Sequence, residues 1–149
     1  RWGMIQVEVA KEQSPVEADK QLVTGVVLVP RIVVLVKQSP RSNQNYRGSI
    51  SNLKELKVED AGKRSYEAMV QNTGDKILEA SIYLALANLE TAEEKTYSPK
   101  QINVYPGQQH KVVLNLPEEP PPGRYALAML MDYGHGSAIE GAQILLTIQ

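Results

Sequence analysis

Apolar and polar residues alternate with a period of two along most of this sequence, which is typical of strands with one buried face. The alternating segments are short and are separated by turn-forming residues. Strands are expected at residues 50–58, 64–71, 77–88, 110–116, 125–131 and 138–148, with a short edge strand within 91–98. This spacing predicts an all-β fold, an immunoglobulin-like antiparallel β-sandwich of about seven strands at residues 46–149.

Three features refine this prediction. The Asn-Thr-Gly-Asp run at 72–75 is expected to turn because Asn and Gly tolerate a positive φ. Residues 77–88 are rich in Ala and Leu, so a helix is the alternative there, but the alternation and the preceding turn favour a strand. Tyr125 begins the penultimate strand, where immunoglobulin-like sandwiches place a tyrosine whose hydroxyl bonds to the backbone at the corner.

The N-terminal part contains two further apolar segments. Residues 2–10 alternate, and residues 25–37 (GVVLVPRIVVLVK) are almost continuously aliphatic, which favours a strand buried on both faces or paired along its length. Pro30 opposes a helix and marks an edge or a bulge. Because two strands bury too little apolar surface to fold alone, residues 1–37 are interpreted as the last two strands of a truncated N-terminal β-sandwich. Residues 38–45 are the predicted linker, and packing of 1–37 on the 46–149 domain is the alternative.

Composition narrows the possible functions. The chain has no Cys, which excludes disulfides, thiolate metal sites and a cysteine nucleophile. The net charge is −1 and no Lys/Arg cluster stands out, so we expect no nucleic-acid partner. No apolar run is long enough for a transmembrane helix, so no membrane span is expected. The sequence starts at Arg1 without Met and without a visible signal peptide, and we expect the natural chain to extend upstream.

The sequence offers little catalytic chemistry. Its two histidines, His110 and His135, lie in no hydrolase or metalloprotease motif, and both are expected to be solvated. Asp132, His135 and Glu140 could gather in one loop as metal ligands, but no second His or Cys supports that idea. We therefore expect no enzyme, no catalytic residue, no metal site and no cofactor.

Two groups of surface residues could still recognise a ligand. Tyr97, Tyr105 and Tyr133 lie in turns and could form a stacking platform, although amphipathic tyrosines at the rim of a sandwich are the favoured interpretation. Glutamates near residue 90 are interpreted as a solvated acidic edge, since a calcium-binding spacing is absent. Neither group predicts a defined ligand.

The segment Arg-Ile-Val-Val-Leu-Val-Lys at 31–37, followed by a polar linker and a second sandwich, resembles the periplasmic pilus-assembly chaperone superfamily. In that superfamily two immunoglobulin-like domains lie in tandem, and the last long strand of the first domain carries alternating apolar residues. The resemblance implies a chaperone-like protein, periplasmic or extracellular, that pairs a strand with an incomplete partner. Basic residues of the first domain anchor a subunit's C-terminal carboxylate in these chaperones, and only Arg31 corresponds to them here.

These observations give a primary hypothesis and an alternative. The primary hypothesis is a non-catalytic binding or assembly protein whose strand 22–37 pairs with a protein partner or with a second copy of the chain. The residues expected at this contact are Val26, Leu28, Arg31, Ile32, Val34 and Val36. The alternative is a structural or adhesive accessory domain of a surface or secreted protein, with recognition by loops at 90–100 and 132–138. The sequence leaves the identity of the partner and the oligomeric state open.

Overall fold

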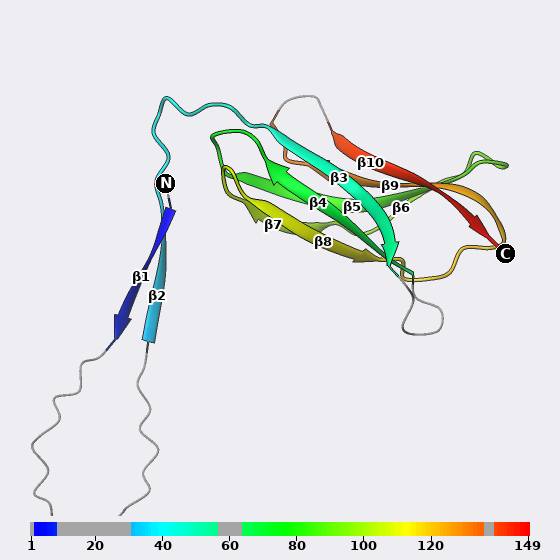
Figure 1. The fold of residues 1–149 in the computed structure, drawn as a ribbon, viewed down its shortest axis with the longest axis horizontal. Helices are drawn as coiled ribbons and strands as arrows, with labels where there is room; N and C mark the ends of the chain where they lie inside the picture. The colour runs from blue at the N-terminus through cyan, green and yellow to red at the C-terminus, as the bar shows by residue number, and fades with distance from the viewer. Residues whose placement is uncertain (1, 9–30, 57–63, 136–138) are drawn as a thin grey trace, which may run out of the picture. The chain divides into compact units, whose positions relative to one another are not determined.

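The computed structural model describes residues 2–8, 31–56, 64–135 and 139–149, and every regular element in these ranges is a β-strand (Figure 1). The chain divides into two compact units, Arg1–Pro40 and Arg41–Gln149. The first unit holds β1 (Trp2–Glu8) and β2 (Arg31–Lys37). The second holds β3 (Gly48–Leu56), β4 (Ser65–Asn72), β5 (Leu78–Asn88), β6 (Glu94–Thr96), β7 (Lys100–Val104), β8 (Gln109–Asn115), β9 (Gly123–Asp132) and β10 (Glu140–Ile148). The predicted all-β class is confirmed.

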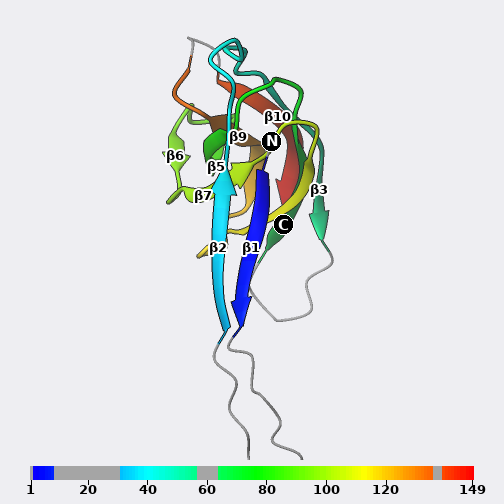
Figure 2. The same cartoon turned by 90° about the vertical axis from the view of Figure 1, so that its left-hand side faces the viewer.

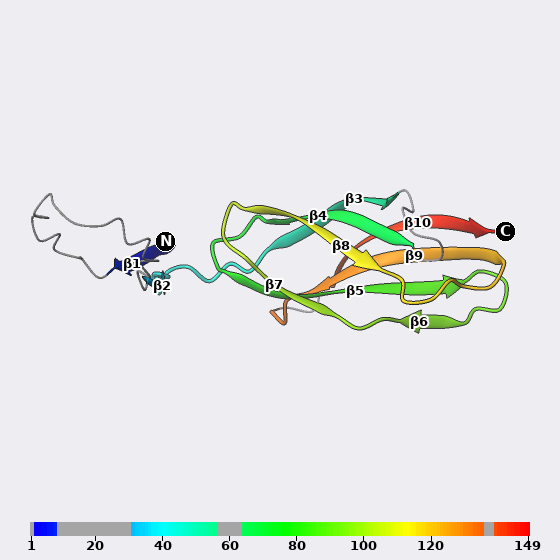
Figure 3. The ribbon, with the colours of Figure 1, turned by 90° about the horizontal axis from the view of Figure 1, so that it is seen from below.

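The second unit is a sandwich of two antiparallel sheets. One sheet has the order β3-β4-β8, and the other has the order β10-β9-β5, with β6 and β7 sharing the remaining edge of β5. Figure 3 shows the two layers edge-on, with β4 and β8 on one side and β5 and β6 on the other. Three strands facing the β5-β9-β10 group is the immunoglobulin-like arrangement that the strand spacing predicted.

The long strand β5 organises the larger sheet. It is a strand, as the alternation predicted, and it pairs with β9 over residues 81–88. Its other edge is divided, because β7 pairs with Leu78–Ile82 and β6 pairs with Ala85–Ala87. The sequence predicted an edge strand within 91–98 but no strand at 100–104, where only Ile102 and Val104 are apolar. The described part of the second unit consequently has eight strands.

The core between the sheets is almost entirely apolar. It follows the predicted alternation, since Ile82, Leu84 and Leu86 of β5 all point inward and are at most 5% exposed. The other large, fully buried side chains are Tyr66, Val70, Leu78, Val104, Leu116, Leu127, Met129 and Met131, together with Asn72. Ala85, predicted to face outward, is also only 6% exposed.

The turn after β4 forms as predicted, but for a different reason. The glycines with positive φ lie elsewhere, for example at Gly107 (φ 77°) and Gly134 (φ 69°). Gly74 is required because a Cβ there would lie 2.3 Å from the carbonyl oxygen of Asn45. This close approach accompanies a hydrogen bond that the backbone amide of Asn45 donates to Oδ1 of Asp75, 2.8 Å away. The C-terminal residues of the predicted linker are thus fastened to the sandwich.

Tyr125 occupies the corner position that was predicted for it. Its hydroxyl donates a hydrogen bond to the carbonyl oxygen of Pro121, 2.9 Å away. The ring itself is 5% exposed and belongs to the core. The structural role expected for this tyrosine is therefore confirmed, and the Pro-rich connection before β9 is held to the sheet by a side chain.

Candidate partner-binding surface

The first unit is a ribbon of two antiparallel strands (Figure 2). Its register pairs Gly3 with Val36, Ile5 with Val34 and Val7 with Ile32. Directly opposed residues of an antiparallel pair lie on the same face. One face of the ribbon, which we call the apolar ribbon face, is therefore formed by Ile5, Val7, Ile32, Val34 and Val36.

The apolar ribbon face is open to solvent in the described part of the chain. Its side chains keep between 43% (Val36) and 64% (Ile32) of their surface exposed. Contiguous exposed apolar surface of this kind is rare on soluble proteins unless it meets a partner. The three predicted site residues Ile32, Val34 and Val36 are brought together here, and the register adds Ile5 and Val7.

Arg31 lies apart from this row. By the alternation of a strand it shares a face with Val33, opposite to the apolar ribbon face. Its Nε lies 3.3 Å from Oε2 of Glu8, directly across the ribbon. The guanidinium therefore already has a carboxylate partner, which the sequence did not indicate. The two other predicted residues, Val26 and Leu28, lie outside the described residues.

No third strand pairs with the ribbon in the part of the chain that the structure describes. The outward N–H and C=O groups along an unpaired strand edge form a template for another extended chain. The ribbon thus combines a main-chain pairing edge with an apolar face, which are the two components of recognition by strand addition.

The described residues assemble no metal-binding cluster. No three His, Asp or Glu side chains among them gather in an arrangement that could hold a metal ion. Asp132 instead accepts a hydrogen bond from the amide of Gly134 at 2.8 Å. The ring of His135 stacks on Tyr46 with centroids 3.6 Å apart, and His110 lies 3.3 Å from Gln108 Oε1. The described residues also include no helix that is long and apolar enough to cross a membrane.

A groove of about 790 Å³ opens at the β6 border of the sandwich. Tyr97 and the Pro-rich connection before β9 line it, and Lys95 lies over the Tyr97 ring, 5.6 Å from its centroid. The full lining is Leu86, Asn88, Glu93, Glu94, Lys95, Tyr97, Glu118, Glu119, Pro120, Pro121, Pro122 and Tyr125. Burial raises the pKa of the Tyr97 hydroxyl above its ordinary value. The sequence pointed to Tyr97 and the acidic edge, but gave no sign that the prolines would face them.

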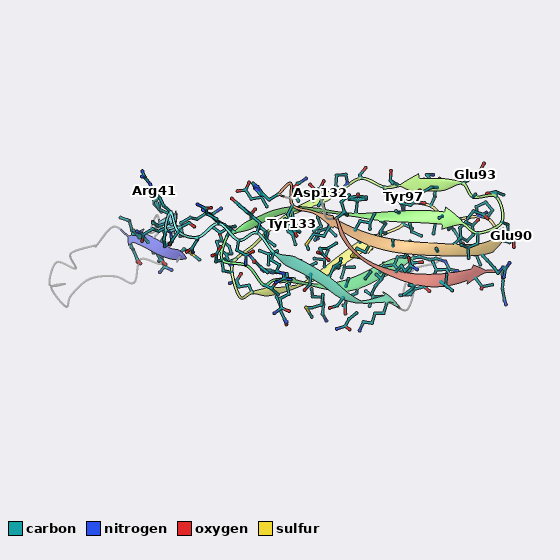
Figure 4. All side chains as sticks on the ribbon, turned by 90° about the horizontal axis from the view of Figure 1, so that it is seen from above. Arg41, Glu90, Glu93, Tyr97, Asp132 and Tyr133 are labelled. Atoms are coloured by element: carbon teal, nitrogen blue, oxygen red, sulfur yellow. The ribbon has the colours of Figure 1, made fainter. Side chains whose placement is uncertain are left out.

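The three tyrosines considered as a platform do not form one. Tyr97 lies beside Tyr125, near the start of β9, in the groove. Tyr133 follows the end of β9 and is only 8% exposed, as part of the core. Figure 4 shows Tyr97 and Tyr133 at separate places along the sandwich. Of these three tyrosines, Tyr97 is the one that lines the groove.

Comparison with known proteins adds a fold likeness. No protein-family model matches the chain, and no curated protein matches it. Over 68% of its length the chain resembles the alkylpurine DNA glycosylase AlkC from Pseudomonas fluorescens, bound to DNA containing an abasic site analog, with 13% identity and a TM-score of 0.50. DesR, a β-glucosidase from Streptomyces venezuelae in complex with D-glucose, matches over 68% of this chain with 12% identity and a TM-score of 0.49. The chain spans 30% of the glycosylase and 15% of the glucosidase, and the likeness to the glycosylase shows the fold alone.

Proposed function

We propose that this chain is a non-catalytic, extracytoplasmic assembly protein that binds a protein partner by strand pairing through its β1–β2 ribbon. The observation that carries the proposal is the apolar ribbon face, on a ribbon that pairs with no third strand in the described part of the chain. The partner would supply an extended segment whose side chains alternate between apolar and polar. The resemblance of residues 31–37 to the pilus-assembly chaperones supports both the mode of binding and the compartment.

The magnitudes favour strand pairing over simple hydrophobic docking. Covering five half-exposed Val and Ile side chains contributes roughly 5 kcal/mol. Association itself costs about 4–15 kcal/mol in lost freedom of motion. The apolar ribbon face alone therefore gives weak binding. Main-chain hydrogen bonds along an edge, each contributing about 1 kcal/mol, supply the remainder and fix the register.

Adjacent valines on β2 allow a matched test. Val34 lies on the apolar ribbon face and is 48% exposed, whereas Val33 is 55% exposed on the opposite face. Fluorescence anisotropy would measure binding of short peptides, about seven residues long, in which Val alternates with Thr. Peptides of the same composition with all Val residues contiguous serve as the reference. We expect the alternating peptides to bind the full chain better, Val34→Asp to abolish binding, and Val33→Asp to retain it.

Two results contradict the proposal. One is equal binding of the alternating peptides and of the reference peptides with contiguous Val residues. The other is equal loss of binding in the Val33→Asp and Val34→Asp variants, which would indicate damage to the ribbon and no recognition by one face. Absence of any binding by the alternating peptides at millimolar concentration would also reject strand pairing.

The Tyr97 groove supports the alternative of an accessory recognition domain. Its aromatic ring and proline wall form a surface suited to stacking against a sugar ring or a peptide. Glycan-array or pull-down binding that is lost in Tyr97→Ala but unchanged in Val34→Asp would favour this function over strand pairing. Loss in Val34→Asp alone would favour the ribbon.

A further inference from the structure

The two outer faces of the sandwich differ in chemistry. The outer face of the β3-β4-β8 sheet is polar at its centre, where Glu67 lies between Lys54 and Lys111, with N–O distances of 3.3 and 3.4 Å. An antiparallel sheet with one solvated face usually has polar residues there. The outer face of the larger sheet departs from this rule. Its centre carries no charged side chain and is built mainly from Ala, Leu and Tyr.

The register arranges these residues in three rows that cross β10, β9 and β5. The first row is Leu145-Ala126-Ala87, the middle row is Gln143-Ala128-Ala85, and the third row is Gly141-Leu130-Tyr83. All nine lie outward, because the residues between them in each strand point into the core. We call these three rows the outer β5–β9–β10 face.

This face is complementary to itself. A two-fold axis that lies in the plane of the contact and runs along the middle row, perpendicular to the strands, lays the first row of one copy over the third row of the other. Leu145 of one copy, which is 72% exposed, then lies over the third row of the other copy, which contains Leu130. Ala126 and Ala87 of one copy lie over the bulkier Leu130 and Tyr83 of the other. In the middle row β9 and β5 carry the small residues Ala128 and Ala85, so neither strand places a large side chain between the two sheets there. Large side chains of one copy thus face small ones of the other.

Gly141 contributes to the shape of this face. A Cβ at position 141 would lie 2.7 Å from Cδ2 of Leu130. The glycine therefore leaves room for Leu130 to lean across β10, so that its side chain lies flat on the sheet. A flat, apolar third row is the surface that an exposed Leu145 of another copy can cover.

The charged residues at the two ends of β9 are also complementary under this two-fold rotation. Arg124 and Asp132 are both outward and exposed, and each is four residues from Ala128 in the middle row. The two-fold axis therefore brings Arg124 of each copy to Asp132 of the other. Arg124 Nε lies 3.6 Å from Glu90 Oε1, and both side chains are largely exposed. This ion pair is therefore weak, and the Arg124 guanidinium can also contact a carboxylate of the second copy. Figure 4 shows Asp132 and Glu90 toward opposite ends of the larger sheet.

We infer that the outer β5–β9–β10 face binds a second copy of this chain, forming a two-fold symmetric dimer in which two larger sheets pack face to face. Three strands about 4.8 Å apart, over nine residues at about 3.4 Å each, give a footprint of about 400 Å² per copy. Interfaces of this size lie at the weak end of specific association. The dimer is therefore expected to be weak and reversible.

The symmetry allows a charge-swap experiment on the full chain. Arg124→Asp alone and Asp132→Arg alone each place like charges together at both ends of the contact. Sedimentation velocity over a concentration series should show the dimer dissociation constant rising about tenfold or more in each variant. An equimolar mixture of the two variants restores opposite charges at both ends, and should recover a heterodimer with near wild-type affinity. Leu145→Asp should dissociate the dimer, while Val113→Asp, on the outer face of the smaller sheet, should not.

The outcomes separate this dimer from association through the ribbon. A chain that stays monomeric up to several hundred micromolar contradicts the inference, and so does a mixture of the two charge variants that remains monomeric. Dimerisation abolished by Val34→Asp but unaffected by Arg124→Asp assigns the contact to the ribbon instead. A dimer that survives Val34→Asp supports the inference even if no peptide binds the ribbon. Circular dichroism spectra of each variant would show that the strands are intact.

Discussion

The side-chain amide of Asn72 donates a hydrogen bond to the carbonyl oxygen of Val104, 2.7 Å away, although the two residues are 32 positions apart in sequence. The same amide donates to the carbonyl oxygen of Lys76 at 2.6 Å, and Oδ1 of Asn72 accepts from the amide of Gly74 at 2.9 Å. Asn72 has no exposed surface and is the buried polar residue of the described core. One side chain therefore fastens the 72–75 turn to the end of β7.

Replacing Asn72 should destabilise the sandwich strongly. Asn72→Ala leaves two buried carbonyl oxygens without their donor, and each such loss costs about 1–3 kcal/mol. We expect the free energy of unfolding, measured by urea denaturation, to fall by about 3 kcal/mol. Asn103→Ala, at an exposed position of β7, is the matched control and should change stability by less than about 0.5 kcal/mol. Equal effects of the two substitutions would contradict this role.

Loss of the Tyr125 hydrogen bond should lower the free energy of unfolding by less than loss of the Asn72 side chain does. Tyr125→Phe keeps the buried ring and removes only the hydrogen bond to Pro121, which should cost about 1 kcal/mol. Urea denaturation of the variant and of Tyr97→Phe would measure the difference. The Tyr97 hydroxyl takes part in no hydrogen bond among the described residues, so its loss should be nearly neutral. A neutral Tyr125→Phe would mean that the corner is held by packing alone.

Glu67 should make the sandwich less stable in acid. Burial opposes ionisation, yet the hydrogen bonds from Lys54 and Lys111 outweigh it and hold the pKa of Glu67 below its ordinary value of 4.5. A carboxylate with a lowered folded-state pKa contributes stability above its unfolded pKa and loses it as the pH falls through the folded value. Glu67→Gln should therefore be less stable than the wild type at neutral pH. The gap should close as urea denaturation is repeated from pH 5 downward, whereas a gap that persists in acid would exclude the ion pairs as its cause.

Tyr66 should make the sandwich less stable in alkali, whereas Glu67 does so in acid. Burial, reinforced by the charge of Glu55, raises the pKa of Tyr66 from 10.0 to about 12. A raised folded-state pKa contributes stability that is complete below the unfolded value of 10.0 and is lost as the pH rises toward 12. Tyr66→Phe should therefore flatten the decline of unfolding free energy over this range. Tyr83→Phe, on the outer face of the larger sheet, is the comparison, and an identical alkaline decline in both variants would contradict the assignment.

Much of the fold was predictable because burial on one face leaves a period-two record in the sequence. β4, β5, β9 and β10 carry that record over eight or more residues each. β7 does not, since its five residues include only two apolar ones, and its position is determined by pairing with β5. The role of Asn72 was also hidden, because a buried turn asparagine and a solvated one look alike in sequence.

The candidate site was predictable only in part. Alternation placed Ile32, Val34 and Val36 in one row, and the structure keeps them on one face. The contribution of Ile5 and Val7 depends on which β1 residue lies opposite which β2 residue. That register depends on the chain between the strands, where the sequence shows no short turn motif. The ion pair between Arg31 and Glu8 follows from the same register and was equally invisible.

The divided edge of β5 has a consequence for the aggregation of this protein. Three residues, Tyr97, Ser98 and Pro99, separate β6 from β7, and Pro99 has no amide hydrogen to offer a neighbouring chain. β6 is three residues long and all three are exposed, with the charged Glu94 and Lys95 adjacent in sequence. Short, charged and interrupted edges of this kind discourage the repeated addition of strands that builds fibrils. At β5, the larger sheet therefore offers another chain no uninterrupted strand on which a fibril could grow.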